Sequence, residues 1–127
     1  MKVVLELHQQ SSNIRRVTVR HDIVIGRGSD CNLRISVQEV SRRHCFLRID
    51  SNREVNITDL ESSNGTWLNG QRTVPGKRYS VEDGMMLAIG PVQFMAHIVI
   101  RCSLARLLSE AMKGQEYVIG VQPQIES

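Results

Sequence analysis

Four side chains that could bind an anion follow one another at positions 41–44. Ser41 carries a hydroxyl group, Arg42 and Arg43 carry planar guanidinium groups, and His44 carries an imidazole. A hydroxyl donor beside a guanidinium fork matches the oxygen atoms of a phosphate or a carboxylate. The spacing therefore indicates an anion site, provided that other segments of the chain supply further donors.

A serine and a histidine three positions apart also suggest a nucleophile with its base, but the surrounding sequence does not support catalysis. Ser41 is not at a strand-to-helix elbow, and no oxyanion loop or third triad member accompanies His44. The four histidines are widely separated, without metal-ligand spacing, and there are no paired carboxylates. We expect a binding protein without enzymatic activity, metal or cofactor, in which His44 is a structural hydrogen-bonding group.

Two other polar loops are candidates for the same site. Gly26, Arg27 and Gly28 form a glycine-rich stretch that lacks the third glycine, the lysine and the following helix of nucleotide-binding loops. Residues 62–66 form a polar turn in which Gly65 can adopt a positive φ angle. Taken alone, each of these loops predicts only a turn.

The elements that carry these loops are expected to be short β-strands. Cys45, Leu47 and Ile49 alternate with more polar residues, which is the period of a strand with one buried face. Asn69-Gly70 is a strong hairpin signal. Strands are expected over residues 2–7, 15–19, 22–25, 32–35, 45–50, 55–58, 66–68, 85–89 and 92–100. Many short, mostly antiparallel strands with closely spaced turns predict an all-β sandwich.

The last 27 positions, 101–127, have a different character. Apolar residues recur there at helical spacing, and Ser103 and Gly114 stand where a helix N-cap and C-cap would be. We expect a short helix over about 103–113 and then a polar tail. The helix either folds back on the sandwich or serves as a docking or dimerising element. The chain is thus divided into one domain, 1–100, and a C-terminal extension, 101–127.

Composition restricts the class of protein further. A chain of 127 residues with 41% hydrophobic content is expected to form one domain with a core. Its formal charge of +3 is modest and only 4% of residues are aromatic, which argues against nucleic-acid binding. The sequence has neither a membrane-spanning apolar run nor the pattern of a signal peptide. Three cysteines without Cys-x-x-Cys spacing suggest reduced thiols and a cytoplasmic protein, or a nuclear one in a eukaryote.

The order and spacing of the loops resemble one family. Gly26-Arg27, Ser41-x-x-His44, the Ser63–Thr66 turn and Asn69-Gly70 together look like the forkhead-associated (FHA) domain, and the resemblance covers roughly residues 2–100. It implies an FHA-type β-sandwich that binds phosphothreonine peptides through loops at one end. The implied partner is a protein phosphorylated by a Ser/Thr kinase. The alternative is a phosphate-independent assembly or oligomerisation domain.

The resemblance assigns an expected role to each matched residue. Arg27 and Ser41 would hold the phosphate directly, and Arg42 would add a second donor. Asn64 would bind the peptide main chain, and Ser63 would contact the phosphopeptide.

Four more residues are expected to support the site. Gly26 and Gly65 are backbone requirements, His44 braces the loop from behind, and Thr66 starts the next strand. Glu39 is a fifth candidate, because its loop faces the peptide beyond the phosphothreonine. Either it disfavours an acidic residue there, in favour of a basic or apolar one, or it is a solvated glutamate without a role.

Overall fold

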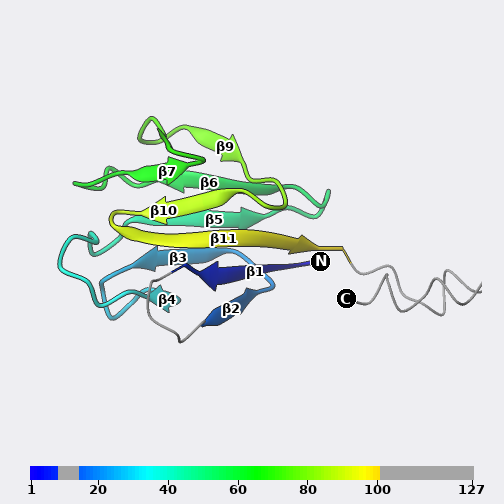
Figure 1. Cartoon of the computed structure of the whole chain (residues 1–127), viewed down its shortest axis with the longest axis horizontal. Helices are drawn as coiled ribbons and strands as arrows, with labels where there is room; N and C mark the ends of the chain where they lie inside the picture. The colour runs from blue at the N-terminus through cyan, green and yellow to red at the C-terminus, as the bar shows by residue number, and fades with distance from the viewer. Residues whose placement is uncertain (9–14, 101–127) are drawn as a thin grey trace, which may run out of the picture.

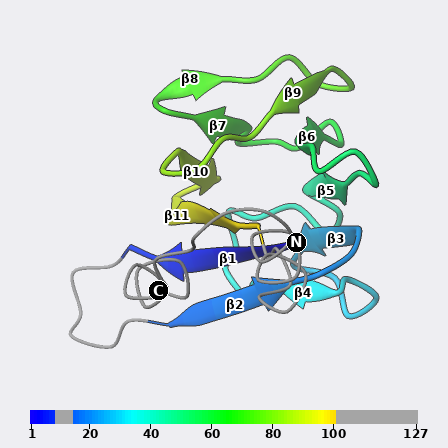
Figure 2. The same ribbon diagram turned by 90° about the vertical axis from the view of Figure 1, so that its right-hand side faces the viewer.

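Two β-sheets face each other in this computed structural model, which describes residues 1–8 and 15–100. Figure 2 shows them as two columns of strands, side by side. One sheet has six strands in the order β2-β1-β11-β10-β7-β8, and the other has five in the order β4-β3-β5-β6-β9. The strand bounds are β1 Lys2–Leu7, β2 Arg16–Val19, β3 Ile23–Gly26, β4 Leu33–Arg34, β5 Cys45–Ile49, β6 Val55–Asp59, β7 Thr66–Leu68, β8 Gln71–Arg72, β9 Arg78–Ser80, β10 Met86–Ile89 and β11 Val92–Val99.

Nearly all strand pairs are antiparallel, as expected from the frequent tight turns. The exception is the pair of β3 and β4, which is parallel, with Ile25 opposite Leu33. The longest pairing joins β1 to β11 over six residue pairs, from Lys2 and Val99 to Leu7 and Phe94. The all-β sandwich predicted from the sequence is confirmed.

The core lies between the sheets and follows the predicted alternation. On β5, Cys45 and Leu47 are fully buried while Phe46 between them is only partly covered. The other strands contribute inward-facing residues in the same way, including Val3, Leu5, Ile23, Ile25, Val55, Ile57, Leu87, Ile89, Phe94 and Ala96. Removing this apolar surface from water is the main source of stability of the sandwich.

The sequence analysis did not predict strands β8 and β9. They are two and three residues long, and because most of their residues are exposed, no apolar alternation indicates them. The helix expected at 103–113 lies outside the described residues, and so does the polar tail. Division of the chain at residue 100 therefore stays a prediction. Among the described residues, no helix is long and apolar enough to cross a membrane.

The strand directions bring the polar loops to one end of the sandwich. β3, β6 and β10 end there, at Gly26, Asp59 and Ile89, whereas β5, β7 and β11 begin there. Figure 1 shows these connections together at the left, while the N-terminus lies at the other end. Segments up to 64 positions apart in the sequence, such as Gly26 and Gly90, thus belong to one loop surface.

Candidate functional site

The end of β3 and the loop before β5 are joined by backbone hydrogen bonds. The amides of Arg27 and Gly28 donate to the carbonyl oxygens of Ser41 and Arg42, both at 2.9 Å. This approach leaves no room for a side chain on Gly26, because a Cβ there would lie 2.2 Å from the Arg42 oxygen. The glycine predicted as a backbone requirement therefore has a direct steric reason. The result is a fixed separation between Arg27 and Ser41.

Arg27 is held in place but keeps donors free. Its Nε atom donates to the Val40 carbonyl at 2.9 Å, and its side chain is half-buried. Within residues 1–8 and 15–100, its two terminal nitrogens make no hydrogen bond or ion pair. A guanidinium fixed through Nε presents its other donors in one direction, which suits an anion with several oxygens.

Ser41 is positioned from three sides. Its amide donates to Nδ1 of His44 at 3.1 Å, its carbonyl accepts from Arg27, and its Oγ accepts from the amide of Ser63 at 3.1 Å. The hydroxyl proton is not used by any of these contacts, so it can be donated to a ligand. Ser41 therefore links the loop of Arg27 to the turn of Ser63.

His44 connects the same two loops from the buried side. It is fully buried, and because Nδ1 accepts from Ser41, Nε2 carries the proton and donates to the Gly65 carbonyl at 2.7 Å. Burial lowers the pKa of His44, although the Gly65 carbonyl and the Asp59 carboxylate act in the opposite direction. The imidazole is therefore neutral and fixed in one tautomer, consistent with a brace and not with a general base.

A buried carboxylate supports the 62–66 turn, and the sequence analysis gave it no role. Asp59 is 1% exposed and accepts from the Ser62 amide at 3.0 Å, from the Ser62 hydroxyl and from the Thr66 hydroxyl at 2.7 Å. The Ser62 oxygen in turn accepts from the Gly65 amide at 3.0 Å. The available signal was an aspartate at a strand end just before serines, a common local hydrogen-bonding pattern.

This support presents Ser63 and Asn64 at the tip of the turn, where both are exposed. The Asn64 Nδ2 donates to the Glu39 carbonyl at 2.7 Å, and the Asn64 carbonyl accepts from the Trp67 indole at 3.1 Å. Gly65 has a φ of +85°, as predicted for this turn. The Asn64 side chain is therefore oriented across the gap between the turn and the loop of Glu39.

Arg42 and Arg43, both exposed in the loop before β5, differ in whether they form an ion pair. Arg43 forms an ion pair with Asp30, at 3.0 Å from its terminal nitrogen. No such partner is found for Arg42 among the residues that the structure describes. The charge of Arg43 is therefore partly balanced by Asp30, whereas that of Arg42 is not balanced by an ion pair among the described residues, and a phosphate contact for Arg42 stays a prediction. The Glu39 side chain is exposed in the same loop.

In the described part of the chain, no group of three or more metal-ligating side chains is found. Burial raises the pKa of the Cys45 thiol, so it is a core residue and not a nucleophile. Cys31 donates its thiol proton to the Arg42 carbonyl.

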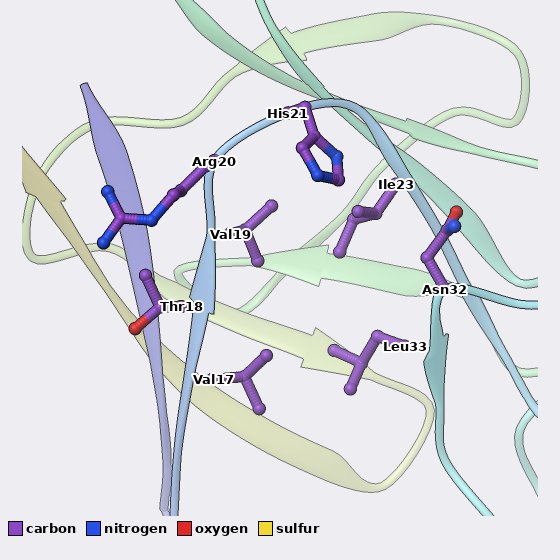
Figure 3. A pocket seen from close by; sticks show the side chains of 8 residues that line it. All are labelled: Val17, Thr18, Val19, Arg20, His21, Ile23, Asn32 and Leu33. Carbon is purple, nitrogen blue, oxygen red and sulfur yellow. The ribbon is translucent and has the colours of Figure 1, made fainter.

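A separate groove lies along the open edge of the sandwich between β2 and β4. Figure 3 shows Val17, Val19, Ile23 and Leu33 around it, with Arg20 and His21 near its rim. Its volume of about 220 Å³ is below the ~300–1,000 Å³ of most small-molecule sites. None of the candidate residues at the loop end lines this groove, so we assign it no function.

Comparison with known proteins identifies one family. The sequence model described as FHA domain matches residues 23–90. The FHA domain-containing protein PS1 of Arabidopsis thaliana is 36% identical over 73 residues, which is 57% of this chain and 5% of that protein. The E3 ubiquitin-protein ligase rnf8 of Danio rerio is 35% identical over 86 residues, 63% of this chain and 16% of the ligase. The chain therefore spans less than a fifth of these relatives.

Solved structures agree with the sequence comparison. An FHA domain from an analysis of phosphothreonine-dependent FHA domain interactions has a TM-score of 0.67 and 27% identity, covering 80% of this chain and all of that one. The FhaA FHA domain, complexed with the intracellular domain of Rv3910, has a TM-score of 0.62 and 28% identity. That match covers 75% of this chain and 99% of the FhaA chain.

Removal of the buried Asp59 carboxylate should destabilise the domain. Asp59→Ala leaves the Ser62 and Thr66 hydroxyls without their acceptor in the interior, at a cost of about 3 kcal/mol in the free energy of unfolding. Urea denaturation measures the loss. Asp50→Ala is the matched control, because that carboxylate accepts from Ser51 and Asn52 at the surface and should matter less. Equal losses in the two variants would contradict the assigned role.

Protonation of His44 should make stability depend on pH near neutrality. Unfolded, this histidine takes up a proton below its ordinary pKa of 6.5, whereas the folded protein does so only at lower pH. The free energy of unfolding should therefore be highest above about pH 6.5 and fall as the pH decreases from there through the lowered folded-state pKa. Urea midpoints at several pH values from 7.5 down to 5 measure this effect. His44→Asn should show a shallower decline, and an equal decline would refute the argument.

Proposed function

The chain belongs to the FHA domain family, and we propose that its loop end binds phosphothreonine-containing peptides and so recruits phosphorylated protein partners. The support comes from the family, from the solved relatives described above and from the donors left free at the loops. FHA domains are binding modules, so the proposed action is recognition without chemical conversion of the ligand. Its proposed place of action is the cytoplasm, or the nucleus in a eukaryote, where Ser/Thr kinases act.

One observation carries the proposal: donors from separate segments are fixed in position and have no acceptor in the described part of the chain. The Ser41 hydroxyl proton and the terminal nitrogens of Arg27 are such donors, and Arg42 adds an unpaired positive charge. A phosphothreonine carries a charge of roughly −1.5 to −2 and three acceptor oxygens. Because the protein has already fixed the donors, binding requires less ordering of side chains.

We assign the remaining contacts to the turn at 62–66. Asn64 lies between this turn and the Glu39 loop, and its side-chain oxygen is unused by the hydrogen bonds found in the described residues. It is therefore suited to bind the main chain of a peptide beside the phosphothreonine and to fix its register. Ser63 lies next to it and is exposed, and its amide donates to the Ser41 hydroxyl oxygen. We propose that its own hydroxyl contacts the phosphopeptide.

The test of the proposal is binding to peptide libraries that contain phosphothreonine, phosphoserine or threonine at a fixed position. The wild-type protein should prefer phosphothreonine, and Arg27→Ala should weaken that binding by about 30-fold or more, because removal of one charged partner costs about 2–5 kcal/mol. Arg27→Lys should also bind weakly, since a point charge does not replace the fork. Fluorescence anisotropy measures both effects.

The control for this test is Arg20→Ala, which removes an exposed arginine from the β2–β3 turn at the other end of the sandwich. It should bind as wild type does. If the folded wild-type protein bound all three libraries equally, or if Arg27→Ala bound phosphothreonine as tightly as wild type, the proposed site would be wrong. The first result would favour the phosphate-independent assembly domain.

We further propose that Glu39 selects against acidic residues in the peptide. Its carboxylate is exposed in the loop that contacts Asn64, so it would repel a like charge on the bound peptide. In phosphothreonine libraries, wild type should deplete Asp and Glu at one flanking position, and Glu39→Gln should relieve this depletion. Deep sequencing or mass spectrometry of the retained peptides measures it. Enrichment of acids at that position by wild type, or an unchanged depletion in the variant, would exclude this role.

A further inference from the structure

We infer that the guanidinium of Arg72 forms a second anion subsite beside the phosphothreonine site, for an acidic side chain or a second phosphate of the same peptide. The inference rests on the proposed function and adds an acidic preference at one flanking position. It comes from contacts on β8, a strand with no apolar pattern in the sequence.

Arg72 is fixed against the turn that carries Ser63. Its terminal nitrogen donates to the Ser63 carbonyl at 3.4 Å, and its guanidinium carbon lies 5.9 Å from the centre of the Trp67 ring. A Cβ on Gly65 would lie 2.5 Å from the Arg72 Nε, so the guanidinium covers this glycine closely. Stacking on an aromatic ring together with a hydrogen bond reduces the freedom of the side chain. The positive charge is thus held at one place on the loop surface.

The charge of Arg72 has no carboxylate partner within the described ranges of the chain. Two other exposed arginines do have one, since Arg16 pairs with Glu6 and Arg43 with Asp30, each at 3.0 Å. Arg20, by contrast, is exposed and also unpaired among the described residues, so the restraint of Arg72 by Trp67 and Ser63 is what distinguishes it. Arg72 is exposed, and a guanidinium has five donors, of which the Ser63 contact uses one. The remaining N–H groups can therefore donate hydrogen bonds to the oxygens of an anionic group. Stacking on Trp67 uses the flat face of the guanidinium and leaves the N–H groups at its edge free.

The distance to the phosphate site fits one bound peptide. Ser63 connects the two, because its amide is 3.1 Å from the Ser41 Oγ and its carbonyl is 3.4 Å from the Arg72 nitrogen. Standard bond lengths limit the span from amide nitrogen to carbonyl oxygen within one residue to about 4 Å, so the Arg72 nitrogen is within about 11 Å of that hydroxyl. An extended peptide covers about 3.3–3.6 Å per residue. An acidic group within three residues of the phosphothreonine can therefore reach Arg72.

The experiment uses phosphothreonine libraries in which one of the three positions on either side is fixed as Asp, Glu, phosphoserine or Ala. For each position, the affinity ratio of the acidic library to the alanine library is measured for wild type, Arg72→Gln and Arg72→Lys, with Arg20→Gln as the control. Wild type and the control should show a ratio of about five at one position, as expected for an exposed ion pair. Arg72→Gln should reduce that ratio to about one, and Arg72→Lys should give an intermediate value.

The outcomes separate this subsite from the phosphothreonine site. Preference for Asp and Glu would identify a carboxylate as the anion, and preference for phosphoserine alone would identify a second phosphate. If Arg72→Gln weakened the acidic and alanine libraries by the same factor, the ratio would persist, Arg72 would be only structural and the inference would be overturned. A wild-type ratio near one at all six positions would also overturn it while leaving phosphothreonine binding intact. In the earlier library test, equal affinity of wild type for the phosphothreonine and the unphosphorylated threonine library would overturn the proposed function and, with it, this subsite.

Discussion

The loop surface depends on one buried imidazole that ties its two main segments together. His44 accepts from the amide of Ser41 and donates to the carbonyl of Gly65, and that carbonyl also accepts from the Gly90 amide at 3.1 Å. Three connections that are far apart in the sequence thus share one hydrogen-bonded centre. Since a buried polar group without partners is costly, this arrangement permits little change in the spacing of the loops. The imidazole serves the site by fixing the positions of its donors.

A second buried group gives the same rigidity to the neighbouring turn. Asp59 satisfies the hydroxyls of Ser62 and Thr66, and the Ser62 oxygen satisfies the Gly65 amide. The side chains that would contact a ligand, Ser63 and Asn64, lie outside this network and remain exposed. Interior polar groups thus hold the backbone of the turn, while the groups proposed to contact a ligand stay at the surface. Such division is typical of a preorganised recognition surface.

Three arginines without a carboxylate partner among the described residues lie at the loop end or on the strand beside it, namely Arg27, Arg42 and Arg72. Unpaired arginines are not confined to this end, since Arg20 and Arg53 lie in turns at the other end of the sandwich. Arg27 and Arg72 differ from these two because each also donates a hydrogen bond to a backbone carbonyl. Positive charge that is held in place in this way attracts anionic ligands and contributes to their association.

The sequence by itself determined the sandwich, most strand positions and the three loops, because these depend on local alternation and on turn residues. Cys45 and Leu47 reveal a buried face, and Gly26, Ser41 and Asn64 mark the loops by type and spacing. Tertiary structure alone decided which groups pair across the loops. Asp59 as a buried acceptor, Arg43 as the partner of Asp30 and Arg72 beside Ser63 depend on contacts between separate loops and strand ends. Such long-range contacts arise from sheet packing and register, and they leave no periodic pattern in the chain.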